Sequence, residues 1–379
     1  MSPAVAARSL SRTFPRSITA SNTTHHLHAV SGHARCILIP SAVTAPKAVP
    51  LIKRTYASKT LPSSSSINTG IDIPSPHIPL PDNAKTITLP DGRKLGYAEY
   101  GDPRGCPFLF VHGIPDCRLD CAPSKKDKEI AMRLGIRWIG IDRPGIGLST
   151  PDPNRTILDW PKDLQHLIDH LKLDSYHVFG VSGGTSYALA CAKLLPRQKL
   201  RSVGIMCGMG PPDSGTKGLS LINRVFLTIW RRFPFIMETY TNRVIVPKAQ
   251  DPDRSKMEEI FRSQVKYAPK GDKEFWGSEE TVQFVTDIWR EVYRQGSAAG
   301  HTQEIKLVGE DWGFELESVT HGNVKFWYGT EDLNTPLAQG KYMADRIPGA
   351  TLKVYEGRSH FTIGDDIEEM LASMLQESY

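Results

Sequence analysis

The sequence YHVFGVSGG, at Tyr176–Gly184, runs from an apolar strand pattern directly into a helical one. Where a strand turns sharply into a helix, the two elements approach so closely that only small side chains fit beside the turn. Gly180 and Gly184 meet this requirement, and Ser182 lies between them. The pattern therefore predicts a serine in a strained backbone conformation, with its hydroxyl above the end of a sheet and near the start of a helix.

Strand and helix patterns alternate on both sides of this turn. Asp91-Gly92 is a strong hairpin signal between the first two strand patterns. Short apolar strands that alternate with helices predict a mostly parallel sheet with helices on both faces, which is an α/β fold. The eight expected strands are Thr86–Leu89, Lys94–Tyr100, Pro107–Val111, Ile136–Ile141, Tyr176–Val181, Ser202–Cys207, Val324–Tyr328 and Leu352–Tyr355. The expected helices include Ile157–Leu173, Thr185–Leu195, Leu337–Arg346 and Ile367–Gln376.

The alternation stops between two late strands. Residues 211–320 are typical of several amphipathic helices, so we expect a helical cap inserted into a core formed by residues 85–210 and 321–379. The cap is rich in aromatic residues, of which we expect some to give a cleft apolar walls and most to pack cap helices together. They are Phe226, Trp230, Phe233, Phe235, Tyr240, Tyr267, Phe275, Trp276, Phe284, Trp289 and Tyr293.

The N-terminal segment has a different composition. No Asp or Glu precedes Asp72, and residues 1–56 contain seven Lys or Arg residues. An acidic-poor, Arg-bearing, Ser-rich start is typical of an organelle-import presequence. The sequence Arg54–Ser58 resembles a mitochondrial processing site. We expect a mitochondrial presequence at 1–56, a Ser- and Pro-rich linker at 57–84 and a matrix location; a cytoplasmic protein with an unstructured tail is the alternative.

Charge and cysteine content argue against several functional classes. Removing the seven N-terminal cations from the 46 basic residues leaves 39 against 41 acidic ones, so the body has no excess positive charge for nucleic acid. The cysteines lack paired metal-ligand spacing, and we expect neither a metal nor a cofactor.

The sequence contains no run of 18 apolar residues, so we expect no transmembrane helix. Leu221–Met237 mixes arginines with bulky apolar residues, but Pro234 interrupts it, which favours a cap helix over peripheral membrane contact.

Ser182 needs a general base, because an unperturbed serine hydroxyl is a weak nucleophile at neutral pH. His177 lies within a strand, His301 within the cap and His321 at the cap's exit. Only His360 follows the last strand, in a loop that can reach over the strand ends. We therefore expect His360 to be the base.

An acid is needed to orient the base and to stabilise its charged form. Asp332 ends an apolar strand at a sharp turn, which makes it the preferred candidate. Glu331 is one position away and is expected to point elsewhere. Asp213, just after the preceding strand, is the reserve candidate.

Attack on a carbonyl also requires two N–H donors for the developing oxyanion. The sequence His112-Gly113-Ile114-Pro115 follows an early strand, and the backbone N–H groups of Ile114 and Gly183 are the expected donors. Pro115 has no N–H to donate. His112 is expected to be a core side chain without a catalytic role.

These motifs resemble those of the α/β-hydrolase fold superfamily, in particular a capped branch with an HG-x-P oxyanion motif and a serine nucleophile. The similar landmarks are Asp91–Tyr97, Asp142–Ser149, the nucleophile turn Gly180–Gly184 and Asp311–Phe314. The order Ser182, Asp332, His360 is the order expected in that fold. Members with HG-x-P include epoxide hydrolases and haloalkane dehalogenases, but these use an aspartate where this chain has Ser182.

The resemblance implies a serine hydrolase that acts through an acyl-enzyme on a small or medium, mostly apolar ester-like substrate. Carbon–carbon bond hydrolysis, a lyase reaction or acyl transfer by the same three residues remain alternatives. A non-enzymatic ligand receptor or scaffold on the same fold is a further alternative, although such proteins often lack a catalytic residue. Substrate, pathway and oligomeric state are left open by the sequence.

Overall fold

The computed structural model describes residues 83–266 and 272–376, and the following description is confined to them. The expected presequence, 1–56, lies outside these residues, as does all of the linker 57–84 except its last two positions. The presequence, the linker and the mitochondrial location therefore remain predictions. Among the described residues, no helix is both long and apolar enough to cross a membrane.

The core is an eight-stranded, mostly parallel sheet, which confirms the predicted fold class. The strands are β1 (Lys85–Thr88), β2 (Lys94–Gly101), β3 (Cys106–Val111), β4 (Ile136–Ile141), β5 (Tyr176–Val181), β6 (Leu200–Met206), β7 (Val324–Gly329) and β8 (Thr351–Tyr355). They lie in the order β1-β2-β4-β3-β5-β6-β7-β8. β2 is antiparallel to both of its neighbours, β1 and β4. The other six strands, β4, β3, β5, β6, β7 and β8, are parallel to one another.

The central strands are apolar runs because both of their faces are covered. In β5, Tyr176 to Gly180 are all buried. The edge hairpin instead turns at Gly92, whose φ of +87° lies in the left-handed region that favours glycine. There the Leu89 N–H donates to the Arg93 carbonyl at 2.8 Å.

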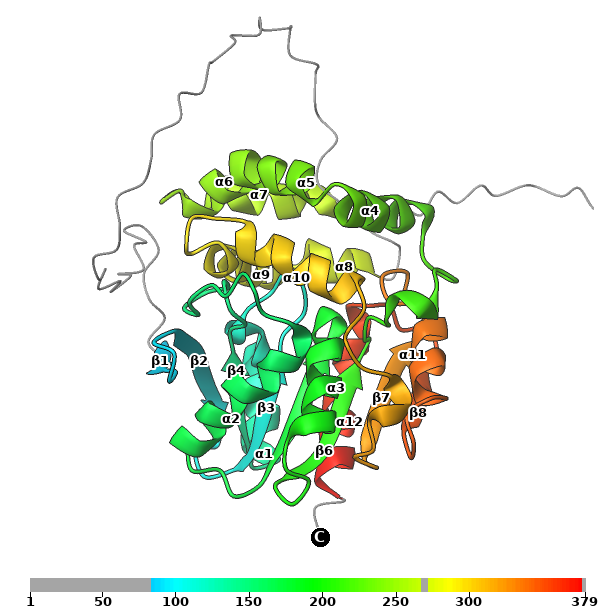
Figure 1. Cartoon of the computed structure of the whole chain (residues 1–379). Helices are drawn as coiled ribbons and strands as arrows, with labels where there is room; N and C mark the ends of the chain where they lie inside the picture. The colour runs from blue at the N-terminus through cyan, green and yellow to red at the C-terminus, as the bar shows by residue number, and fades with distance from the viewer. Residues whose placement is uncertain (1–82, 267–271, 377–379) are drawn as a thin grey trace, which may run out of the picture. The chain divides into compact units, whose positions relative to one another are not determined.

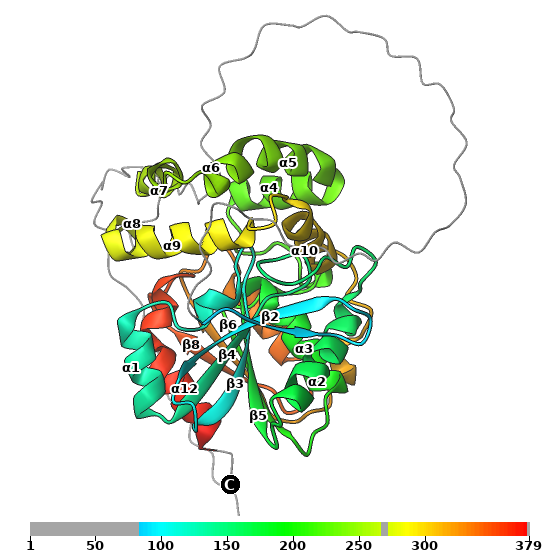
Figure 2. The same cartoon turned by 90° about the vertical axis from the view of Figure 1, so that its left-hand side faces the viewer.

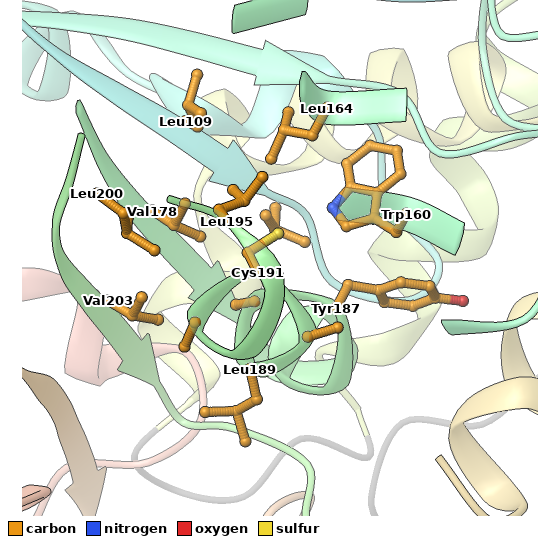
Figure 3. Close-up of a cluster of buried hydrophobic side chains, with 14 of the residues drawn as sticks. Leu109, Trp160, Leu164, Val178, Tyr187, Leu189, Cys191, Leu195, Leu200 and Val203 are labelled. Atoms are coloured by element: carbon orange, nitrogen blue, oxygen red, sulfur yellow. The ribbon is translucent and has the colours of Figure 1, made fainter. Parts of the chain in front are cut away.

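Helices cover both faces of the sheet (Figures 1 and 2). On one face, α2 (Trp160–His170), α3 (Thr185–Leu194) and α11 (Leu337–Ala344) bury their side chains in one apolar cluster, part of which is drawn in Figure 3. On the other face, α1 (Lys125–Arg133) and α12 (Ile367–Leu375) form a second cluster. The sheet therefore holds the turn at Gly180–Gly184 between two packed layers.

The cap consists of helices inserted between β6 and β7, within the range expected from the sequence. They are α4 (Leu221–Arg232), α5 (Pro234–Tyr240), the π-helical segment η5 (Thr241–Ile245), α6 (Val246–Gln250), α7 (Ser255–Gln264), α8 (Lys273–Gly277), α9 (Glu279–Val292) and α10 (Ala299–Gly309). In both views α4–α7 lie farther from the sheet than α8–α10 (Figures 1 and 2). The cap has an apolar cluster of its own.

Two buried carboxylates attach the inner cap helices to the core. Glu291 of α9 accepts from the Arg118 Nη1 at 2.6 Å, and that guanidinium also donates to Asp142 at 2.7 Å. Glu304 of α10 lies between two core arginines, Arg143 and Arg155. Removing one partner from such a buried pair leaves an uncompensated charge, so these contacts fix the inner cap helices in place.

Candidate active site

Ser182 lies at the sharp turn between β5 and α3. Its φ of +50° is left-handed, which a non-glycine residue adopts only where the surroundings enforce it. A Cβ on Gly184 would lie 2.3 Å from the Val111 carbonyl oxygen, and one on Gly180 would lie 2.8 Å from the Ala188 Cβ. Both glycines are therefore required by close approach, for the reason that the sequence suggested.

The loop after β3 lies beside this turn. A Cβ on Gly113 would be 3.5 Å from the Ser182 Cβ, and one on Gly183 would be 2.7 Å from the Ile114 side chain. The two backbone N–H groups expected to stabilise an oxyanion, those of Ile114 and Gly183, thus belong to adjacent segments next to the serine. The Ile114–Pro115 peptide bond is cis.

The His112 side chain is a buried structural group. Its Nε2 accepts the Arg143 backbone N–H at 3.2 Å, which leaves the proton on Nδ1 for the Gly113 carbonyl at 2.9 Å. Burial, and then the nearby Arg143 charge, lower the pKa of His112 to about 3. The ring is therefore neutral, and it orders the loop rather than facing Ser182.

Arg143 holds the same loop from the other side. Its guanidinium donates to the carbonyls of His112 at 2.5 Å and Gly113 at 2.8 Å, and its Nε donates to Glu304 of the cap at 2.5 Å. Burial raises the pKa of Glu304, but Arg143 and Arg155 outweigh burial and hold that pKa at about 2. One charged cluster therefore joins cap helix α10 to the loop that carries the Ile114 N–H.

His360 and Asp332 are brought together by the loops after β8 and β7. The His360 Nδ1 lies 2.8 Å from Asp332 Oδ2. The other carboxylate oxygen, Oδ1, accepts the backbone N–H groups of Asn334 and Thr335, each at 2.8 Å. The carboxylate is fully buried and aimed at the imidazole, as the orienting acid of a catalytic histidine must be.

Thr335 is a site residue that the sequence analysis missed. Its hydroxyl lies 2.9 Å from Asp332 Oδ2, 3.0 Å from His360 Nδ1 and 2.7 Å from the Cys207 carbonyl. It therefore links the acid, the base and the end of β6. The sequence does offer a signal: Thr335 follows Asp332 by three residues in a tight turn, where such side chains commonly bond to the turn backbone.

The pKa of His360 is set by two opposing effects. Burial lowers the pKa of the imidazole, but the Asp332 carboxylate outweighs burial, and the resulting pKa lies well above its ordinary value. With Nδ1 donating to Asp332, Nε2 is the nitrogen that can accept a proton. Ser182 and His360 line the same cavity, although no hydrogen bond joins their side chains in the described part of the chain.

The other candidate bases lie elsewhere. His177 stacks on Phe108 in the sheet, and its Nδ1 lies 2.7 Å from a serine hydroxyl of β6. His321 bonds to a backbone carbonyl of β6 at 2.8 Å. His301 lines the cavity from α10, but its Nδ1 lies 2.8 Å from the Tyr293 hydroxyl. None of the three is paired with Asp332.

The reserve acid is not brought to the base either. Asp213 is exposed on the 3-10 helix η4 (Pro212–Ser214), whereas the imidazole bonds to Asp332. Glu331 is exposed, and its backbone N–H donates to the Arg358 carbonyl at 3.0 Å. Of the three acids, Asp332 is the one that bonds to His360.

A cavity of about 970 Å³ lies between the core and the cap. Ser182, Ile114 and His360 border it, and most of the other lining side chains are apolar. Of the ten described cap aromatics predicted from the sequence, seven line this cavity: Phe226, Trp230, Phe275, Trp276, Phe284, Trp289 and Tyr293. Phe233 and Phe235 are exposed instead, Tyr240 packs partly buried against the cap's own apolar cluster, and Tyr267 lies outside the described residues. More aromatics form the cavity wall than the sequence analysis expected.

Two carboxyl groups also border the cavity and were not anticipated. Asp116 Oδ2 accepts the Gly113 N–H at 3.3 Å, and Oδ1 accepts the Cys117 N–H at 2.6 Å. Burial raises the pKa of Asp116 to about 6, and both burial and Asp116 raise that of the neighbouring Asp120. Two acids in contact repel each other when both are ionised, and for Asp120 this repulsion adds to the effect of burial.

One group among the described residues brings potential metal ligands together. Ligand atoms of Cys207, Asp332 and His360 lie within 4.8 Å of one another. The His360 Nδ1 already bonds to Asp332, and Thr335 bonds to both, so a cation would have to displace the Nδ1 proton. The arrangement is that of a hydrogen-bonded pair; the absence of a cofactor remains an expectation.

Comparison with known proteins points to one fold family. Residues 107–366 match the family described as alpha/beta hydrolase fold. A proline iminopeptidase of Arabidopsis thaliana is 32% identical over 122 residues, which are 31% of this chain and 30% of the relative. A non-heme chloroperoxidase of Streptomyces lividans is 26% identical over 290 residues, 73% of this chain and 92% of the relative. The chain thus matches only about a third of the length of the iminopeptidase.

Solved structures share the architecture at low identity. The enol-lactonase of Burkholderia xenovorans superposes with a TM-score of 0.56 at 16% identity, covering 77% of this chain and 100% of the lactonase. Identity at this level establishes a common fold. It carries no information about the substrate.

Proposed function

This chain belongs to the alpha/beta hydrolase fold family, and we propose that it is a serine hydrolase that cleaves ester-like bonds through an acyl-enzyme on Ser182. The observation that carries the proposal is one cavity bordered by a left-handed Ser182 and by a His360 bonded to a buried Asp332 at 2.8 Å. The proposed nucleophile and base thus border one cavity, and the proposed orienting acid bonds to the base.

Each residue has a defined role in the proposed reaction. The Ser182 Oγ attacks the substrate carbonyl while the His360 Nε2 takes its proton. Asp332 holds the Nδ1 proton and stabilises the imidazolium. The N–H groups of Ile114 and Gly183 bind the oxyanion, and losing one such donor typically costs about 3–4 kcal/mol in the transition state. His360 then protonates the leaving alcohol, and water attacks the acyl-enzyme with His360 as base.

The cavity supports a mostly apolar acyl group of small or medium size. Aromatic side chains form much of its wall, and its volume of about 970 Å³ is at the upper end of the usual range for small-molecule sites. An apolar acyl chain gains free energy there in proportion to the area that it removes from water.

The alternatives differ in their products. Carbon–carbon bond hydrolysis, a lyase reaction and acyl transfer can each use the same three residues, and adding an alcohol acceptor separates transfer from hydrolysis. A non-enzymatic receptor is less well supported, because the chain has all three side chains of the proposed catalytic set. Slow ligand binding without turnover would be its signature.

Fluorophosphonate labelling tests the nucleophile directly. We expect the native protein to gain one covalent adduct on the peptide that contains Ser182, and the heat-denatured protein to gain none. A panel of p-nitrophenyl esters of increasing acyl length should then show higher kcat/KM for chains longer than acetate. A label on another serine, or no label on a folded protein, would contradict the proposal.

The pH dependence follows from the raised pKa of His360. The imidazolium cannot accept the Ser182 proton, so kcat/KM should rise with pH through this pKa, with a midpoint above the ordinary value of 6.5. Asp332→Asn removes the charge that raises the pKa, so it should lower the midpoint as well as the rate. The measurement is kcat/KM against pH for both proteins. A wild-type midpoint below 6.5 that is unchanged in Asp332→Asn would rule out this coupling.

A further inference from the structure

Helix α4 has two apolar faces, and only one of them is covered. Its inward side chains Phe226, Leu227 and Trp230 line the cavity. On the opposite side, Leu221 and Val225 are exposed by 77% and 51%, followed one turn later by Ile229 at 36%. Residues four apart in a helix share a face, so the three exposed side chains form one stripe.

The stripe continues past the end of α4 into α5. Phe233, Phe235 and Ile236 are exposed by 47%, 65% and 48%. Together with Leu221, Val225 and Ile229 they make up six of the ten large exposed apolar side chains in the described residues, and we call these six the outer cap patch. Both views place α4 and α5 in the outer layer of the cap, away from the sheet (Figures 1 and 2). Contiguous exposed apolar surface of this kind marks an interaction site.

The charged side chains of α4, beside the outer cap patch, are all positive. Arg224, Arg231 and Arg232 are exposed on α4, and none of them forms an ion pair within residues 83–266 and 272–376. Arg224 and Arg231 also border the cavity, and the Arg224 Nε donates to the Leu219 carbonyl at 3.2 Å, whereas Arg232 does not line the cavity. Residues 214–237 contain no Asp or Glu at all. An apolar stripe flanked by exposed arginines that form no ion pair among the described residues matches the boundary between the acyl chains and the anionic headgroups of a bilayer.

We propose that the outer cap patch docks this protein onto membranes that contain anionic phospholipids. The apolar side chains enter the acyl boundary while the arginines contact the phosphates. The same helix then has one face in the bilayer and the other in the wall of the cavity. Docking itself does not depend on the proposed hydrolase reaction.

Other occupants of the patch fit the charges less well. A second copy on a two-fold axis would bring two sets of three α4 arginines together, with one acid per copy, Glu238, within residues 214–238 to offset them. Residues 1–56 of the chain carry seven cations and no acid, so they offer no complementary charge. The sequence analysis favoured a helix gripping the core over membrane contact, but α4 has a separate face for each.

The first test localises the contact by hydrogen exchange in the full-length protein. Vesicles of phosphatidylglycerol and phosphatidylcholine should slow exchange in peptides covering 221–237, while peptides from α12 stay unchanged. Vesicles of pure phosphatidylcholine should have much less effect. Because the readout is local, vesicle binding through the basic N-terminal segment alone would leave 221–237 unprotected and would overturn the proposal.

The second test uses matched substitutions at equal exposure. Val225→Glu on α4 should weaken vesicle co-sedimentation by about tenfold or more, because it places a charge at the acyl boundary. Leu194→Glu on α3, also 51% exposed, should leave binding unchanged. Arg232→Gln should weaken binding about fivefold at low salt. Neither Val225 nor Arg232 lines the cavity, so hydrolysis of a soluble ester should persist in each variant. This measurement separates a loss of membrane docking from a failure of the proposed catalytic roles.

Equal vesicle binding by Val225→Glu and Leu194→Glu would overturn the proposal. So would a wild-type protein that sediments as a concentration-dependent dimer, if Val225→Glu makes it monomeric and vesicles do not compete. That second result would identify another copy of the chain as the occupant.

Discussion

Replacing Ser182 with alanine is expected to lower kcat by about 10⁵-fold or more, because no other group can form the acyl-enzyme. The substitution removes one oxygen from a half-buried position and leaves the turn intact. Since Ala lacks only the Oγ, the free energy of unfolding should change by less than about 1 kcal/mol. Turnover of the best ester in the panel, measured beside a thermal unfolding curve, tests both statements.

Ser186 provides the matched control for this substitution. It is the second residue of α3, is fully buried, and its hydroxyl has no hydrogen-bond partner among the described residues. Ser186→Ala should therefore retain activity and either keep or slightly gain stability. Turnover of Ser182→Ala within tenfold of the wild type would reject Ser182 as the nucleophile, because removal of a true nucleophile cannot be so mild.

The sheet could be predicted closely because its signals are local. The strand Tyr176–Val181 was expected with the same bounds that β5 has, and Ile136–Ile141 coincides with β4. Apolar runs bounded by turn residues specify buried strands without information from distant parts of the chain. The helix expected at Ile157–Leu173 instead begins with a 3-10 turn, η2 (Ile157–Asp159), and α2 ends at His170. Helix ends depend on capping and tertiary packing, which periodicity does not encode.

The candidate site was predictable where backbone chemistry dictates residue type. Close approach requires Gly180 and Gly184, and a loop after the last strand singles out His360. Thr335 and the Asp116–Asp120 pair were missed because each depends on a side-chain contact formed only in the folded chain. The cavity wall was underestimated for the same reason, since helical spacing does not say which of two apolar faces meets the core.

Arg143 shows the same limit, because its role depends on contacts that form only in the folded chain. The segment Asp142–Ser149, which contains Arg143, could be recognised by its resemblance to the family. The partners of Arg143, however, come from three separate segments: the loop after β3, Tyr187 on α3 and Glu304 on α10. Arg143→Ala removes a fully buried charge and leaves the Glu304 carboxylate one guanidinium short. We expect the free energy of unfolding to fall by about 3–5 kcal/mol, as measured by denaturant titration.

An exposed ion pair supplies the contrast. Arg133 and Glu368 lie 2.6 Å apart, yet both side chains are about half exposed to solvent. Arg133→Ala should therefore cost less than about 1 kcal/mol, because water screens the pair and solvates the remaining carboxylate. If Arg143→Ala is no more destabilised than Arg133→Ala, the charged cluster does not hold the cap to the core.

Arg143 should also affect the reaction without touching the substrate. It fixes the carbonyls of His112 and Gly113, which immediately precede the Ile114 N–H, so its loss should let that donor drift from the oxyanion position. At a temperature where the variant is folded, kcat should fall by roughly tenfold to a hundredfold while KM changes less, because a transition-state interaction is lost. Arg143→Lys keeps the charge but cannot reach both carbonyls and Glu304 in the planar geometry of a guanidinium. It should therefore recover part of the stability but little of kcat, whereas a purely structural role would make both recover together.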